Sequence, residues 1–87
     1  VETQLHQNYP NPFNPATAIS FRLSATSYTS LKVFNALGEE VATLARGMLP
    51  AGSYTARWEA ASLPGGVYFC RLQAGSFVAT RTLLLIR

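Results

Sequence analysis

Apolar and polar side chains alternate with period two along most of this 87-residue chain, in short runs separated by turn residues. In residues 17–23, Ile19, Phe21 and Leu23 fall on one face while Arg22 falls on the other. Successive side chains of a strand point to opposite faces, so the pattern predicts strands that are buried on one side. The runs expected to form strands are residues 17–23, 29–34, 39–45, 53–59, 66–73 and 77–86, with a possible seventh in residues 2–6.

Turn-forming residues separate these runs at intervals typical of a β-sandwich. Six or seven short strands predict an all-β, immunoglobulin-like antiparallel β-sandwich, in which two sheets pack face to face. Residues 37–49 could instead form a short helix by propensity, but Gly38 and Gly47 favour a strand. We expect Glu39 and Glu40 to lie on that strand and to point to opposite faces. The predicted turns are residues 24–27, 35–38, 46–52, 61–66 and 74–76.

Aromatic residues mark the expected core. Tyr68 follows a Pro-Gly-Gly corner and stands two residues before Cys70, which resembles the tyrosine corner of immunoglobulin-like sandwiches. In that corner the tyrosine hydroxyl bonds back to nearby backbone. Alternation points Tyr68, Cys70 and Leu72 inward together, and Trp58 is the other expected anchor. Cys70 is the only cysteine, so no intrachain disulfide joins the sheets and packing alone must hold them together.

The segment before the first long strand is rich in proline. Pro10, Pro12 and Pro15 cannot pair in the middle of a sheet, and each favours an extended conformation in the residue before it. The segment is therefore expected to be a stiff, stretched strap, held on the core by the rings of Tyr9 and Phe13. It can be interpreted either as an ordered surface loop or as a family signature at the start of a domain.

Size and composition limit the range of functions. The length fits one domain, with residues 8–87 as its core and residues 1–7 as the end of a linker or the first strand. Charged residues make up 13% of the chain and the net charge is +3, with no two cationic residues adjacent, so no nucleic-acid partner is expected. The chain resembles a piece of a longer protein, and Arg87 is expected to be its true C-terminus.

The residues that catalysis or metal binding would need are scarce. His6 is the only histidine, there is no Asp, and Cys70 is expected to be buried. Glu39 and Glu40 would point to opposite faces, so they are not the facing carboxylate pair of a glycosidase. The sequence therefore predicts no enzyme, no cofactor and no metal site.

Four segments, in this order, are similar to one known family. They are NYPNPFNPATAISFRL, LKVFNALGEEVATL, LPAGSYTARWEA and LPGGVYFCRLQAGSFVATRTLLLIR. Together they resemble the type A C-terminal sorting domain of the type IX secretion system of Bacteroidota, over about Leu5 to Arg87. The resemblance implies an immunoglobulin-like sandwich related to that of flagellar hook-capping proteins. It also implies a cargo protein ahead of Val1, for which this domain is a non-catalytic secretion signal.

The resemblance further implies a route and partners. The cargo would cross the inner membrane by a signal peptide and fold in the periplasm. The outer-membrane translocon would bind the sorting domain, and a sortase-like cysteine protease would remove it, leaving the cargo at the cell surface or in the medium. A weak homodimer through unpaired edge strands is a further alternative.

The family motifs can be placed on this sequence residue by residue. The middle motif falls on Gly38, Glu39, Glu40 and Val41, although the family usually has a basic residue where Glu39 stands. Thr82 occupies a position that is usually basic before the terminal apolar run. The motif residues expected to serve structure are Pro10, Asn11, Pro12, Phe13, Gly38, Val41 and Trp58. The candidates for translocon recognition are Gly66, Val67, Tyr68, Leu72, Gly75, Arg81, Leu83, Leu84, Leu85, Ile86 and Arg87, with Arg87 expected to be solvated and of little weight in stability.

The alternative function is a non-catalytic carbohydrate-binding or spacer module of an extracellular enzyme. Enough aromatic rings are present for a sugar-stacking platform, although most fall on core-facing registers. The rings concerned are Tyr9, Phe13, Tyr28, Phe34, Tyr54, Trp58, Tyr68, Phe69 and Phe77.

Overall fold

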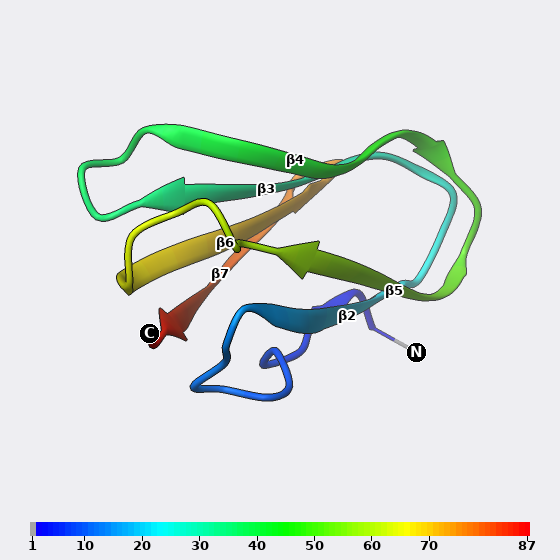
Figure 1. Cartoon of the computed structure of the whole chain (residues 1–87). Coiled ribbons are helices and arrows are strands. Elements are labelled where there is room, and N and C mark those ends of the chain that lie inside the picture. The colour runs from blue at the N-terminus through cyan, green and yellow to red at the C-terminus, as the bar shows by residue number, and fades with distance from the viewer. Residues whose placement is uncertain (1) are drawn as a thin grey trace.

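Two antiparallel sheets make up the computed structural model, which describes residues 2–87 and leaves Val1 outside the described part (Figure 1). The all-β, immunoglobulin-like sandwich predicted from the alternation is confirmed. No helix among residues 2–87 has the length and apolar character needed to cross a membrane. Sheet A has the order β1 (Gln4–Leu5), β2 (Ala16–Leu23), β5 (Gly52–Glu59), and sheet B has the order β4 (Glu40–Leu49), β3 (Ser27–Asn35), β6 (Gly66–Ala74), β7 (Phe77–Leu85).

The core lies between the sheets and is built from the alternate residues that the sequence predicts. Ile19 and Phe21 of sheet A face Leu31 and Cys70 of sheet B, and all four are at most 2% exposed. Burial of such side chains contributes about 1.5–3 kcal/mol each relative to leaving them in water, which is the main force that holds the sheets together. Every buried side-chain N or O among residues 2–87 has a hydrogen-bond partner.

Strand β4 differs from its prediction. It continues through the expected turn at residues 46–52, and only Pro50 and Ala51 separate it from β5. Two irregularities interrupt its pairing with β3, because Leu44 and Val41 have no direct partner in the register. These bulges give β4 a burial pattern with an approximate period of three in place of the two-residue period of a regular strand.

The turn before β4 also corrects the sequence prediction. Glu39 lies in this turn rather than on the strand, so Glu39 and Glu40 are not strand neighbours on opposite faces. The Asn35 side-chain oxygen accepts hydrogen bonds from the backbone N–H groups of Leu37 and Glu39, and its amide donates to the Glu39 carboxylate at 2.8 Å. Gly38 takes the positive φ of 84° that this tight turn requires.

The proline-rich strap, residues 8–15, is bent rather than stretched. Bends run through residues 10–12 and 14–15, so the prediction of an extended segment is wrong. The reason is a buried polar network inside the strap, in which the Asn8 amide donates to the Thr17 hydroxyl at 2.9 Å and both side chains bond the Pro10 carbonyl. Phe13 is buried as expected, but the ring of Tyr9 is 81% exposed and does not hold the strap on the core.

Candidate functional site

The strap lies along the outer edge of β7, a strand that carries the recognition candidates Arg81, Leu83, Leu84 and Leu85. Phe13 donates its backbone N–H to the Leu84 carbonyl at 2.9 Å and accepts from the N–H of Ile86 at 3.0 Å. The Asn11 side-chain oxygen accepts the N–H of Leu84 at 3.0 Å. The backbone of β7 is therefore paired on both sides near its end, with β6 and with the strap.

An aromatic row fastens the strap to the core. The Phe13 ring packs at 5.6 Å from Trp58, and Trp58 in turn meets the edge of Tyr68 at 5.4 Å. The predicted burial of Trp58 and Tyr68 is confirmed, at 5% and 4% exposure. Such aromatic pairs add about 0.5–1.5 kcal/mol beyond the area that they bury.

The predicted tyrosine corner is present, and a second one accompanies it. The Tyr68 hydroxyl donates to the Pro64 carbonyl at 2.6 Å, and the Tyr54 hydroxyl donates to the Pro50 carbonyl at 2.5 Å. The sequence analysis missed the corner at Tyr54, although the signal is visible. Both corners have the pattern Pro-x-Gly-x-Tyr, as PAGSY in residues 50–54 and PGGVY in residues 64–68.

Arg87 is exposed, as expected, but its side chain is also anchored, which the sequence did not predict. Its guanidinium nitrogen Nη2 lies within hydrogen-bond reach of the carbonyls of Ala60, Ala61 and Leu63. A Cβ on Gly65 would stand 3.1 Å from the Arg87 side chain and 3.2 Å from the Leu85 carbonyl oxygen. The loop between β5 and β6 therefore closes on the end of the chain, and the glycine at position 65 allows the close approach.

Arg81 has an anchored side chain as well. Its position in β7 faces Cys70 across the ladder, and Cys70 is fully buried. Its Nε donates to the Leu5 carbonyl at 3.0 Å, which joins sheet B to β1 of sheet A. Arg81 is thus an exposed charge whose side chain also links β7 of sheet B to β1 of sheet A.

The remaining recognition candidates separate into buried and exposed groups. Gly75 lies in the β6–β7 turn, at the end of the sandwich opposite to the C-terminus, where its φ of 59° suits a two-residue hairpin turn. Gly66 is half-buried at the start of β6. Tyr68, Leu72, Leu83 and Leu85 are buried, whereas Val67, Leu84 and Ile86 are exposed.

The structural motif residues also have defined places. Gly38 is exposed in its turn, and Val41 is half-buried against the core at a bulge of β4. Pro10, Asn11 and Pro12 are exposed on the strap, while Phe13 and Trp58 are buried.

Exposed apolar residues gather at the end of the sandwich where β7 finishes. The β3–β4 turn, the β5–β6 loop and the C-terminus lie together at the left of Figure 1. Residues 35–37 and 64–68 line one shallow concavity of about 210 Å³, and Val67 pairs directly with Leu84. We call the exposed side chains here the terminal patch: Leu37, Val67, Leu84 and Ile86, which are 85%, 41%, 38% and 48% exposed.

Reactive groups are sparse in the part of the chain that the structure describes. No group of three or more His, Cys, Asp or Glu side chains comes together within residues 2–87. Burial raises the pKa of the Cys70 thiol to about 11, so little reactive thiolate forms near neutral pH. Of the rings considered for a sugar platform, Phe13, Trp58 and Tyr68 are in the core, while Tyr9 and Tyr28 are exposed.

Comparison with known proteins gives a family and a fold. The model of the secretion system C-terminal sorting domain matches residues 7–86. Among solved structures, CopC from Methylosinus trichosporium OB3b is similar, with a TM-score of 0.58 and 16% identity over 97% of this chain and 91% of that chain. The Ig1 domain of mouse SynCAM 2 is similar with a TM-score of 0.51 and 14% identity, over 91% and 92% of the two chains. At these identities the two structures show the fold alone. No curated protein matches this chain significantly.

Proposed function

Because this chain belongs to the secretion system C-terminal sorting domain family, we propose that the type IX machinery reads it at the terminal patch. Members of this family are the type IX sorting signals of cargo proteins. The chain is accordingly a secretion signal and a non-catalytic tail, which engages the type IX machinery and directs its cargo to the cell surface or extracellular space. The terminal patch specifies where on the sandwich that engagement takes place.

One observation carries the proposal. Four exposed apolar side chains gather where the β3–β4 turn, the β5–β6 loop and the C-terminus meet, while the β7 backbone beside them is already hydrogen-bonded on both sides. Contiguous exposed apolar surface with a polar rim is typical of protein interaction sites. A partner would therefore contact side chains of the folded end instead of adding a strand to β7. The buried candidates, such as Leu83 and Leu85, act by keeping this end folded.

The proposal includes the finer steps of export. The cargo passes through the periplasm, the outer-membrane translocon binds the terminal patch, and a sortase-like cysteine protease cuts the segment that joins cargo to β1. Residues 1–87 act as one sorting domain with its core in residues 8–87, and the domain works without catalysis, cofactor or metal.

The experiment is a fluorescent reporter with a signal peptide and residues 1–87, expressed in a host with a working type IX system. We expect the intact fusion to reach the surface or medium, and the double variant Leu84→Ser, Ile86→Ser to stay in the periplasm. The matched control is Val78→Ser, because Val78 is an exposed apolar residue on the same face of β7 at its far end. Unfolding midpoints of all three domains confirm that each is folded.

Equal export of the double variant and the intact fusion would contradict the proposal that the terminal patch is the recognition site. Equal loss of export in the Val78→Ser control would mean that any change on β7 interferes, and would also contradict it. A fusion that lacks residues 81–87 should remain in the periplasm in either case, because it loses half of β7.

A further inference from the structure

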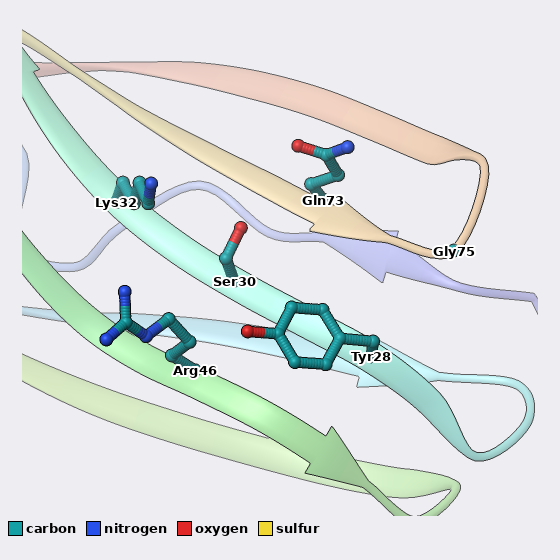
Figure 2. Close-up of a pocket in the computed structure, with 6 residues that line it drawn as sticks. All are labelled: Tyr28, Ser30, Lys32, Arg46, Gln73 and Gly75. Carbon is teal, nitrogen blue, oxygen red and sulfur yellow. The ribbon is translucent and has the colours of Figure 1, made fainter.

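The outer face of sheet B carries ordered rows of polar side chains that are not part of the terminal patch. In the register of the sheet, Arg46, Ser30 and Gln73 stand side by side across β4, β3 and β6. Lys32 and Arg71 occupy the next row along β3 and β6. Figure 2 shows Tyr28, Ser30, Lys32, Arg46 and Gln73 projecting from three neighbouring strands around a concavity of about 340 Å³.

This face has an excess of positive charge in an unfavourable arrangement. Lys32 and Arg71 are direct partners across the β3–β6 ladder, and like charges at such positions destabilise a sheet. Lys32 is 3.5 Å from the Glu40 carboxylate, which also accepts a hydrogen bond from Thr43 at 2.7 Å. Arg71 lies over the Phe34 ring at 4.9 Å, and no ion pair to Arg71 or Arg46 occurs within residues 2–87. Of the three cations on this face, only Lys32 is paired with a carboxylate in the part of the chain that the structure describes. A bound anion would therefore relieve the repulsion between them.

The other groups of the concavity suit a sugar. The Tyr28 ring is 58% exposed at its rim and offers an apolar face, against which a sugar ring can stack. The Ser30 hydroxyl and the Gln73 amide can each donate and accept hydrogen bonds, as sugar hydroxyls require. The central strands β3 and β6 are paired on both sides, so a ligand that lies over them meets side chains rather than free backbone groups.

We propose that this face of sheet B binds an acidic carbohydrate, with its carboxylate or phosphate groups beside Arg46 and Lys32 and a sugar ring on Tyr28. Arg71 lines the adjoining concavity with Phe34 and adds to the positive charge of the face. The open, shallow shape suits a chain that lies across the strands. An acidic polypeptide would satisfy the cations, but it would make less use of the exposed ring and of the Ser30 and Gln73 pair. The inference is independent of the terminal patch, which lies on other side chains at the end of the sandwich.

The test is a titration of the isotope-labelled 87-residue chain, followed by the shifts of its backbone amide signals. The probes are oligogalacturonate, maltohexaose as a neutral sugar, and poly-L-glutamate of matched charge. We expect oligogalacturonate to give saturable shifts at Ser30, Lys32, Arg46 and Gln73, and to bind more weakly as salt is added. Arg46→Gln and Tyr28→Ala should each weaken binding about tenfold, the usual effect of losing one good contact.

The matched control is Arg57→Gln, because Arg57 is an exposed cation on sheet A. It should leave the affinity unchanged, and unfolding midpoints will show that each variant is folded. Three results would overturn the proposal: maltohexaose binding as tightly as oligogalacturonate, Arg57→Gln weakening binding as much as Arg46→Gln, or no saturable binding at millimolar sugar. Tighter binding of poly-L-glutamate than of oligogalacturonate would assign the face to an acidic protein segment and would also overturn it.

Discussion

Single side chains that donate hydrogen bonds to loop carbonyls fix the loops at the ends of this sandwich. Tyr68, Tyr54 and Arg87 each bond to a carbonyl in a loop, and each loop is thereby fixed against the sheet. The two tyrosines follow a local pattern and are predictable from sequence. The contact of Arg87 is not, because Ala61 lies 26 residues away and a terminal charge gives no local sign of a partner.

The two tyrosine corners contain the same type of hydrogen bond, which is partly buried at Tyr68 and exposed at Tyr54. Tyr68→Phe removes a partly buried bond, so we expect it to lower the free energy of unfolding by about 1–2 kcal/mol, because the Pro64 carbonyl loses its donor. Tyr54→Phe removes an exposed bond, and water can replace the donor, so its cost should be about 0.5 kcal/mol. Denaturant unfolding of the two variants measures both costs. A larger loss in Tyr54→Phe than in Tyr68→Phe would contradict this order.

Cys70 gives the domain a pH dependence in the alkaline range. Burial raises its pKa from the ordinary value of 9.0 to about 11 in the folded chain, so the unfolded chain loses the thiol proton first as the pH rises. Stability from this group is complete below pH 9 and falls as the pH approaches 11, by at most about 2–3 kcal/mol.

Denaturant unfolding at pH values from about 8 to about 11 should show this fall in the free energy of unfolding of the wild-type chain. The Cys70→Ala variant controls for every pH effect that does not come from the thiol. Identical pH profiles for the two chains would contradict the assignment. Ellman's reagent should react slowly with the native thiol and quickly in guanidinium.

At the scale of elements, the alternation of side chains predicts where strands form, but it does not predict which segments they pair with. Residues 17–23 and 53–59 lie on strands with the expected faces buried, because a two-residue period is a local property. The bulges of β4 and the place of the strap depend on segments that are distant in sequence. Asn11 and Thr82, for example, are 71 residues apart. The structure shows which of the recognition candidates face solvent and which are buried, and their role in recognition stays a prediction.

A substitution in the strap can show whether this segment stabilises the edge of sheet B or is only an ordered surface loop. Asn11→Ala removes the acceptor for the N–H of Leu84, and we expect a loss of about 1 kcal/mol in the free energy of unfolding. Faster hydrogen exchange at Leu84 and Ile86 should accompany this loss, because the same segment covers both amides. Asn14→Ala is the control, since Asn14 is exposed on the same strap. Unchanged exchange at Leu84 in Asn11→Ala would contradict the role of the strap as an edge cover.

At the scale of the whole molecule, the four sheet edges are protected unequally. Sheet A begins with the two-residue β1, β7 is covered by the strap, and β4 is interrupted by bulges. Only β5 is long and regular at an edge among the strands of residues 2–87. The Ala60 N–H bonds the Pro15 carbonyl, so alternation turns the backbone groups of Thr55 away from β2.

A weak homodimer, if the isolated domain forms one, should therefore use β5. Sedimentation at rising concentration measures the association. Thr55→Pro should abolish it and leave the fold intact, because proline is tolerated where an edge N–H faces solvent. Ala56→Pro should unfold the domain, because the Ala56 N–H belongs to the ladder with β2. Association that survives Thr55→Pro would place the dimer contact elsewhere.

The bond between the strap and the end of β7 has a consequence for synthesis on the ribosome. Phe13 is made before all the long strands of the sandwich, yet its backbone partners are Leu84 and Ile86, at and just beyond the end of β7. Contacts of such long sequence separation form late in folding. A truncated product that stops before residue 84 leaves the Phe13 amide and carbonyl without these partners and the sheet open at one side. Closure of the domain thus reports that translation has run through to residue 86, and a cargo with an incomplete tail would be distinguishable by its unfinished fold.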